Sequence, residues 1–254
     1  MSKNKELSED EFQIYKINRS ILKLIEEYKT SKNIANDQIN ILDFGCGRGR
    51  SVLKLKIEGY NIFGVDVDSL PINNAKKLYE HYGFNVKQLL SEIDVNNRTL
   101  FPDNYFDIVF SIQVVEHIQH IETFLNEIAR ITKPSGINYH IFPFKYHYKE
   151  QHLGMPLIHW LPKNKLRKNL IQLMVLFGVE PFWEEFNGIN KNLRALKYYQ
   201  YSCLKTFYRS NGYFRNKLDE LGYDIEIINR RFGLKLLNIN TYFPHSTELV
   251  LIKH

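Results

Sequence analysis

Three alternating glycines form a loop between an apolar run and a helical pattern: Gly45, Gly47 and Gly49. Glycine adopts a positive φ without strain and lets a ligand approach the backbone closely, so this loop is a candidate ligand cradle. The spacing departs from the G-x-G-x-x-G pattern that seats a pyrophosphate, because Arg50 stands where that pattern needs its third glycine. Asp43, just before the loop, can accept hydrogen bonds from backbone amides or from a ligand amine. The alternative is a tight strand-to-helix turn that binds nothing.

Two further carboxylates follow later apolar runs. Asp66 lies about 20 residues beyond the glycine loop, where α/β nucleotide sites place a carboxylate on ribose hydroxyls. Asp94 can accept a hydrogen bond from an adenine amino group, with Val95 against the ring. The alternatives are a helix N-cap for Asp66, although Ser69 is better placed for that role, and an ordinary loop carboxylate for Asp94.

Histidines in two segments are candidate general bases, because imidazole titrates near neutral pH. His117 follows Glu116 after the fourth apolar run, and His147 and His152 follow the fifth. Packing or helix capping is the alternative role for each of the three.

Short apolar runs alternate with helical patterns along the chain and position these side chains. Strands are expected over 39–44, 61–67, 86–90, 106–112 and 137–142, and later over 223–229 and 247–252. Helices are expected over 9–30, 50–58, 69–82, 118–132 and 213–221. Such alternation is typical of a doubly wound parallel sheet, in which ligands bind at the carboxyl ends of the strands.

The alternation breaks after Pro143, where residues become helical, aromatic and basic. We expect a helical insertion that forms a lid over the ligand edge of the sheet. The expected parts are an N-terminal helix and linker over 1–37, a ligand-binding core over 38–143, the insertion over 144–211, and a helix and strands completing the sheet over 212–254. The basic excess between Gln151 and Lys235 favours an anionic partner or a solvated face.

Composition narrows the class of protein further. Two cysteines, Cys46 and Cys203, are too few for a disulfide framework and lack metal-type spacing. The polar N-terminus has no apolar segment typical of a signal peptide. The sequence also lacks a run of about 18 apolar residues, which a transmembrane helix needs. We therefore expect a cytoplasmic protein; the sequence does not indicate its oligomeric state.

Five segments resemble, in order and rough spacing, those of class I S-adenosylmethionine (SAM) dependent methyltransferases, most closely the type 11/12 small-molecule branch. They are Asp43 to Gly49, Gly64 to Asp66, Asp94 to Val95, Phe101 to Asp107 and Val114 to His117. The resemblance implies a Rossmann-like, seven-stranded sheet whose last strand is antiparallel, with SAM bound across the ends of the first four strands.

The resemblance also implies roles for individual residues. Gly45 and Gly47 would lie against the methionine part of SAM, Asp66 on the ribose, and Ser111 to Gln113 near the sulfonium. The predicted cofactor-binding residues are Asp43, Gly45, Cys46, Gly47, Asp66, Val67, Asp94, Val95 and Gln113, and the predicted catalytic residues are His117, His147 and His152.

A metal site is an alternative at the fourth apolar run. Small-RNA 2′-O-methyltransferases and ubiquinone-pathway O-methyltransferases carry an ExxEH segment that binds a divalent metal. This chain has Gln113 in place of the first acid, followed by Glu116 and His117, and an amide is a weaker ligand than a carboxylate. We expect no metal; His147 or His152 would complete the alternative site.

The expected function is SAM-dependent methyl transfer to a small-molecule acceptor, at an oxygen of a sugar or secondary metabolite. One alternative is an RNA methyltransferase whose basic aromatic insertion stacks on bases. Another is a SAM-binding protein without catalytic activity. The helical pattern over 163–177 fits a lid helix or a membrane-surface helix.

Overall fold

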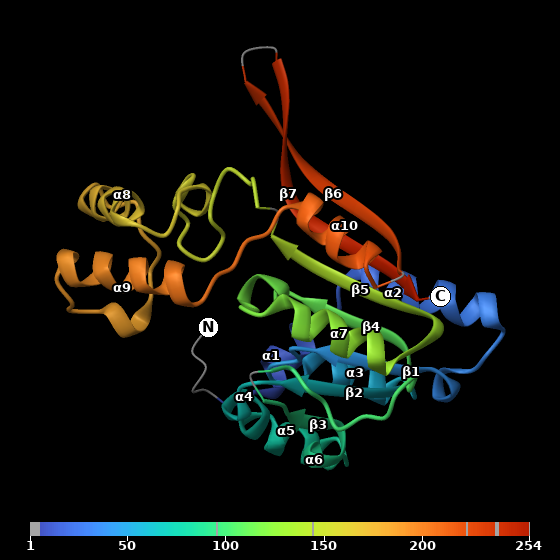
Figure 1. Cartoon of the computed structure of the whole chain (residues 1–254). Coiled ribbons are helices and arrows are strands. Elements are labelled where there is room, and N and C mark those ends of the chain that lie inside the picture. The colour runs from blue at the N-terminus through green and yellow to red at the C-terminus, as the bar shows by residue number, and fades with distance from the viewer. Residues whose placement is uncertain (1–5, 95, 144, 222, 237–238, 254) are drawn as a thin grey trace.

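A sheet of seven strands forms the centre of the computed structural model, in the order β3-β2-β1-β4-β5-β7-β6 (Figure 1). The structure describes residues 6–94, 96–143, 145–221, 223–236 and 239–253, without the side chains of 225 and 228–247. The strands are β1 (Asn40–Phe44), β2 (Asn61–Asp66), β3 (Leu90–Glu92), β4 (Phe106–Ile112), β5 (Thr132–Pro143), β6 (Tyr223–Leu236) and β7 (Ile239–Lys253). Strands β1 to β5 are parallel, and β7 is antiparallel to both β5 and β6. The predicted fold class is therefore confirmed.

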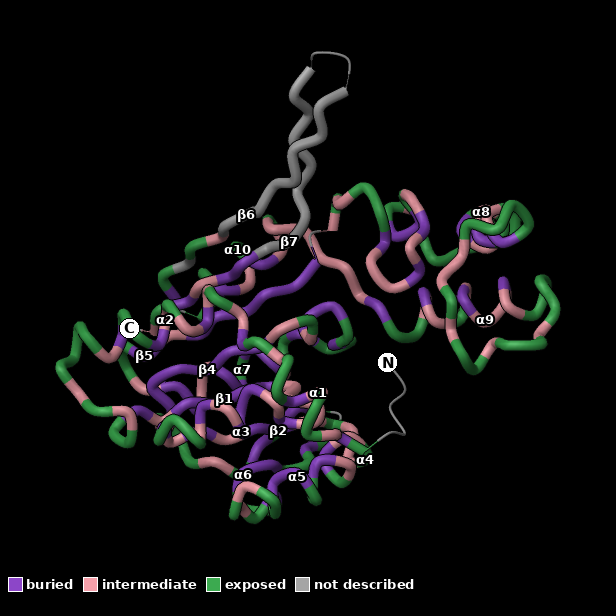
Figure 2. Tube along the Cα trace, turned by 180° about the vertical axis from the view of Figure 1, so that it is seen from behind, coloured by how far each residue is buried: buried purple, intermediate pink, exposed green. Residues whose placement is uncertain are grey.

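Helices cover both faces of this sheet. They are α1 (Glu9–Ile14), α2 (Arg19–Lys32), α3 (Arg50–Ile57), α4 (Ser69–Asn74), α5 (Lys76–His81), α6 (Val86–Leu89), α7 (Ile121–Ile131) and α10 (Asn211–Asp219). Two more helices, α8 (Lys165–Leu176) and α9 (Lys191–Leu204), lie beside the sheet. Successive strand residues point to opposite faces. Ile41 therefore packs under the helices α1 to α6, whereas Leu42 packs under α7 and α10. Each face has its own apolar cluster, and the burial pattern follows these two layers (Figure 2).

Four local predictions are wrong. The helix expected over 69–82 is two helices, α4 and α5, which meet at Ala75. The helix expected over 9–30 is broken between α1 and α2, where the Asn18 side chain accepts a hydrogen bond from Ser20 N and starts a new helix. The strand expected over 86–90 is mostly α6, because Asn85 caps that segment as a helix and leaves β3 for the following residues. Asp68, not Ser69, is the N-cap of α4.

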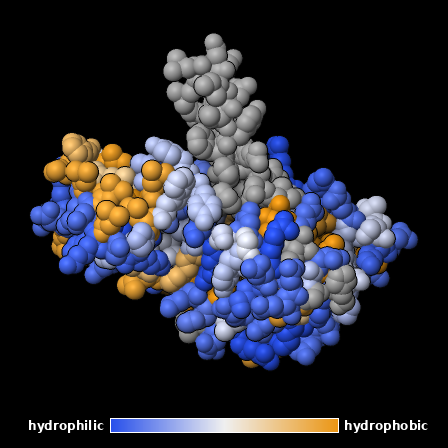
Figure 3. Space-filling view, turned by 45° about the horizontal axis from the view of Figure 1, so that its top comes forward, coloured by the Kyte–Doolittle hydropathy of each residue, from blue (hydrophilic) through white to orange (hydrophobic). Residues whose placement is uncertain are grey.

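The insertion after β5 forms a lobe with a separate apolar cluster that includes Leu153, Ile171 and Tyr198. Helices α8 and α9 lie side by side in this lobe, on the side toward which β5 points (Figures 1 and 2). Apolar side chains also gather on its surface, among them Leu173 and Phe177 (Figure 3). The four-part division of the chain stays a prediction.

Candidate active site

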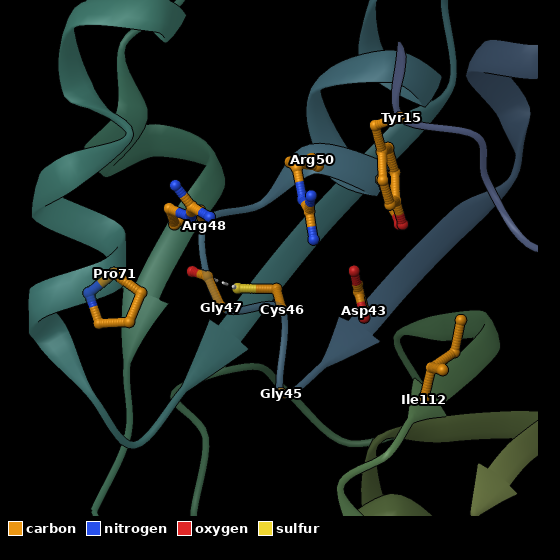
Figure 4. Close-up of a pocket in the computed structure, with 10 residues that line it drawn as sticks. Tyr15, Asp43, Gly45, Cys46, Gly47, Arg48, Arg50, Pro71 and Ile112 are labelled. Carbon is orange, nitrogen blue, oxygen red and sulfur yellow. Dashed lines mark hydrogen bonds between the residues drawn. The ribbon is translucent and has the colours of Figure 1, made fainter. Parts of the chain in front are cut away.

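The glycine loop lines a pocket of about 420 Å³ beside the end of β1 (Figure 4). The lining residues are Tyr15, Asp43, Gly45, Cys46, Gly47, Arg48, Arg50, Ser51, Pro71 and Ile112. Gly45 and Gly47 have φ values of 80° and 54°. A Cβ on Gly47 would meet nothing within 4 Å, whereas one on Gly45 would lie 2.3 Å from Val114 Cγ2. Gly47 therefore exposes backbone to the pocket, and Gly45 lets the loop pack on the segment after β4.

Asp66, at the end of β2, braces this loop. Its Oδ2 accepts a hydrogen bond from Gly47 N at 2.7 Å, and its Oδ1 accepts one from Asp68 N at 3.0 Å. A carboxylate has about four acceptor positions, so both oxygens retain capacity for ligand hydroxyls. The carboxylate predicted to bind ribose thus lies directly against the predicted cradle.

Asp43 places a buried carboxyl group on the pocket wall. Burial raises its pKa to about 7, and the nearby Asp66 charge adds to the shift. Loss of hydration penalises the charged form, and a cation beside the carboxylate would favour it again. Asp43 is therefore a candidate partner for a ligand ammonium group, in a pocket that Arg48 and Arg50 also line.

The chain before α2 contributes a wall that the sequence did not suggest. The Arg50 guanidinium lies 4.4 Å from the centre of the Tyr15 ring, and Tyr15 Oη is 2.7 Å from Ser51 Oγ. Arg48 Nη1 is 3.1 Å from Glu11 Oε2, which ties the loop to α1. The helix break after α1 is what brings Tyr15 to the pocket.

Of the predicted cofactor residues, Asp66, Val67, Asp94 and Gln113 are not among those that line this pocket. Val67 is exposed, and Asp94 Oδ1 accepts a hydrogen bond from Asn96 N at 2.9 Å within an exposed turn. Val95 lies outside the described residues. Gln113 has a positive φ of 59° and donates its N–H to Ile141 O, while the preceding Ile112 lines the pocket.

A second group of side chains lies after β4, which neighbours β1 in the sheet. Glu116, in the short helix η2 (Val115–His117), is buried, and neither carboxyl oxygen has a hydrogen-bond partner among the described residues. Its Oε1 lies 3.9 Å from His117 Nε2 and 3.8 Å from His152 Nε2. One ligand atom from each of the three residues lies within 4.8 Å of the others. We call Glu116, His117 and His152 the acid–histidine cluster.

This cluster has the composition of either a proton-transfer site or a metal site. Burial raises the pKa of Glu116 to about 8, and the nearby Glu150 adds to the shift. Burial also lowers the pKa of His152, so its imidazole is neutral near pH 7 and can accept a proton. A carboxylate and two imidazoles are also ligands that divalent transition metals accept.

The last residues of the insertion, 205–209, contact the cluster. We call this segment the strap. Phe207 N donates to Glu116 O at 2.6 Å, and His117 Nδ1 lies 2.6 Å from Lys205 O. Tyr208 Oη donates to Glu150 Oε1 at 2.5 Å, within the insertion. Two predicted catalytic histidines, His117 and His152, are thus brought together by residues far apart in the sequence.

His147, the third predicted catalytic histidine, has other neighbours. Its Nδ1 lies 2.7 Å from Lys149 O, and its carbonyl oxygen accepts a hydrogen bond from Trp160 Nε1 at 2.9 Å. Glu116 is instead the residue that lies within 4 Å of both other histidines, His117 and His152. Its position next to His117 was visible in the sequence, but its burial was not.

Comparison with known proteins identifies the class of this fold. Residues 42–139 match the family model described as a methyltransferase domain. The ubiquinone biosynthesis O-methyltransferase of Rickettsia bellii (strain OSU 85-389) is 30% identical over 114 residues, which cover 45% of this chain and 45% of the relative. The chain thus spans about half the length of the curated relatives it matches.

Solved structures share the fold at low identity. A SAM-dependent methyltransferase from Methanosarcina mazei superposes with a TM-score of 0.55 at 17% identity, covering 94% of this chain and 99% of that one. A SAM-dependent methyltransferase from Mesorhizobium loti superposes with a TM-score of 0.52 at 13% identity, covering 88% of this chain and 95% of that one.

Residues 42–139 therefore match a methyltransferase domain, and the chain has the fold that these solved SAM-dependent methyltransferases share. The predicted methyltransferase class agrees with this family match and with the shared fold. In the part of the chain that the structure describes, no helix has the length and apolar character needed to cross a bilayer.

Proposed function

We propose that this protein transfers a methyl group from SAM to a hydroxyl oxygen of a small-molecule acceptor. The observation that carries the proposal is the closeness of the glycine-loop pocket to the acid–histidine cluster. Val114, two residues before Glu116, packs directly against Gly45 of the loop. The named activity of the Rickettsia relatives, O-methylation in ubiquinone biosynthesis, supports oxygen as the reacting atom.

The residues of the pocket fit the cofactor. When bound, SAM supplies a methyl group that its sulfonium has already activated, so alignment of the reactants contributes much of the rate. Asp43 is positioned to hold the ammonium group through a charged hydrogen bond. Gly47 leaves the backbone open to close approach, and Asp66 offers acceptors for the ribose hydroxyls.

The acid–histidine cluster is positioned to handle the proton of the acceptor hydroxyl. His152 Nε2 has no hydrogen-bond partner among the described residues, and burial keeps its pKa below the usual range, so it can accept that proton. His117, on the exposed side of Glu116, is the second candidate base. Such a base contributes about 10²–10⁴-fold to the rate.

Incubation of the protein with SAM carrying a tritiated methyl group and a cell extract tests the proposal. We expect label in the small-molecule fraction, stable to mild alkali as an ether is. His152→Ala should lower the incorporation while leaving SAM binding intact. Label in RNA or protein would contradict the acceptor class, and alkali-labile label would contradict an ether product.

A further inference from the structure

A basic pocket lies in the insertion, away from the glycine loop. It has a volume of about 280 Å³ and is lined by His159, Lys163, Arg167, Thr206, Phe207, Tyr208 and Arg209. Its walls are the turn before α8, the first residues of α8 and the strap. Three of the lining residues are cations, and none of the lining residues is an acid.

The three cations have no carboxylate within ion-pair distance among the described residues. Burial lowers the pKa of Lys163, Arg167 and Arg209, and repulsion from the two arginines lowers that of Lys163 further. The charges of Glu150 and Glu122 act on Arg167 and Arg209 from a distance. Uncompensated positive charge in a partly buried site favours the entry of an anion.

Backbone carbonyls hold the cations in place without using all their donors. Lys163 Nζ donates to Cys203 O and Thr206 O, which leaves one of its three donors. Arg167 donates to Leu161 O and Ser202 O. The end of α9 and the Phe207 ring, centred 4.1 Å from Lys163 Nζ, stabilise these cations. Neither carries a full negative charge, so the net charge of the pocket stays positive.

Arg209 is held in the same way. Its guanidinium donates three hydrogen bonds, to the carbonyl oxygens of Phe207, Ile118 and Gln119, and a guanidinium has five donors. His159, which also lines the pocket, is buried, and its Nδ1 has no hydrogen-bond partner among the described residues. Several residues that line the pocket therefore have polar atoms with unused hydrogen-bonding capacity.

We propose that this pocket binds a phosphate group of the acceptor, an assignment of substrate class that rests on the proposed methyl transfer. A phosphate monoester carries a charge near −2 and three acceptor oxygens, which match three cations better than a carboxylate does. The strap connects this pocket to the acid–histidine cluster, since Phe207 contacts Glu116 and Tyr208 contacts Glu150. A phosphorylated hydroxy compound bound here would extend toward the cluster.

Calorimetric titration of the full-length protein with inorganic pyrophosphate tests the pocket without any methyl transfer. We expect saturable binding that Lys163→Gln and Arg209→Gln each weaken by about tenfold or more, because each removes a charged hydrogen bond. The exposed Lys165→Gln, the same change nearby on α8, is the matched control and should bind as the wild type does. Absence of saturable binding, or equal loss in Lys165→Gln, would overturn the proposal.

Two further arms keep the test decisive if a variant unfolds. Wild-type protein should bind acetate much more weakly than pyrophosphate, and equal affinity would overturn the choice of phosphate. A short single-stranded RNA that competes with pyrophosphate and binds more tightly would contradict the small-molecule acceptor and indicate a nucleic-acid acceptor. A parallel titration with SAM separates the two proposals. Pyrophosphate binding without SAM binding would support the anion pocket and refute the proposed methyl transfer.

Discussion

At the scale of residues, two buried carboxyl groups define the two halves of the site. Asp43 lies on the wall of the glycine-loop pocket, and Glu116 lies at the centre of the acid–histidine cluster. Burial raises the pKa of Asp43 to about 7 and that of Glu116 to about 8. Perturbed carboxyl groups that converge near a pocket are typical of functional sites.

Replacing Asp43 by Asn should weaken SAM binding by about 1–3 kcal/mol, because an amide cannot provide the charged hydrogen bond to an ammonium group. Calorimetry at pH 8 measures this loss. Asp37→Asn, the same change at an exposed position, is the matched control. An Asp43→Asn protein that binds SAM as tightly as the control would show that the ammonium lies elsewhere.

Asp43 should also make SAM binding depend on pH. Because burial raises the pKa of its carboxyl to about 7, affinity should increase as the group ionises with rising pH. The stability of the free protein should change in the opposite direction. A folded-state pKa above the usual 3.8 means that Asp43 makes folding less favourable as pH rises from about 4 to about 7.

Asp43→Asn removes this loss, so its thermal stability relative to the wild type should increase over that interval and level off above it. Thermal unfolding followed across the same pH interval measures the difference. A difference in melting temperature that stays constant with pH would show that the carboxyl is not protonated in the folded protein.

The buried carboxyl group of Glu116 can hold either a proton or a metal ion at the cluster. Without an ion, burial raises the pKa of its carboxyl group to about 8, so a proton can occupy the place that a metal ion would take. We therefore expect methyl transfer to persist after dialysis against EDTA. Loss of activity that a divalent ion restores would instead make Glu116, His117 and His152 metal ligands.

At the scale of elements, the alternating apolar patterns of the sequence predicted the strands and helices of the core well. They did not predict the short segments at helix breaks. Apolar residues continue at helical spacing across the break between α1 and α2, so periodicity alone suggested one helix. The Asn18 cap was the local signal for the break, and Asn85 was the equivalent signal for α6. Both caps bring polar side chains to backbone amides, which periodicity does not detect.

The helix break has a measurable consequence at Tyr15. Tyr15→Ala should weaken SAM binding by about 0.5–2 kcal/mol, because it removes the ring beneath Arg50 and opens one wall of the pocket. Ile14→Ala, at the exposed neighbouring residue, is the matched control and should leave binding unchanged. Calorimetry on both variants measures the contrast, and equal effects would place the wall outside the cofactor site.

At the scale of the whole molecule, the second half of the site is made by contacts that no local pattern contains. The glycine loop, Asp43 and Asp66 were predictable because strand order places them at one edge of the sheet. The environment of Glu116 was not predictable, because it depends on a contact with Phe207, about 90 residues later in the insertion. The basic pocket likewise brings together the start of α8 and the strap, which are separated in the sequence by α9.

A crystal structure of the protein with S-adenosylhomocysteine tests the central claim most directly. The account predicts the ligand against Gly47, with its ammonium group at Asp43 and its ribose at Asp66. Ligand bound elsewhere, or a glycine-loop pocket that stays closed by side chains at saturating ligand, would contradict it.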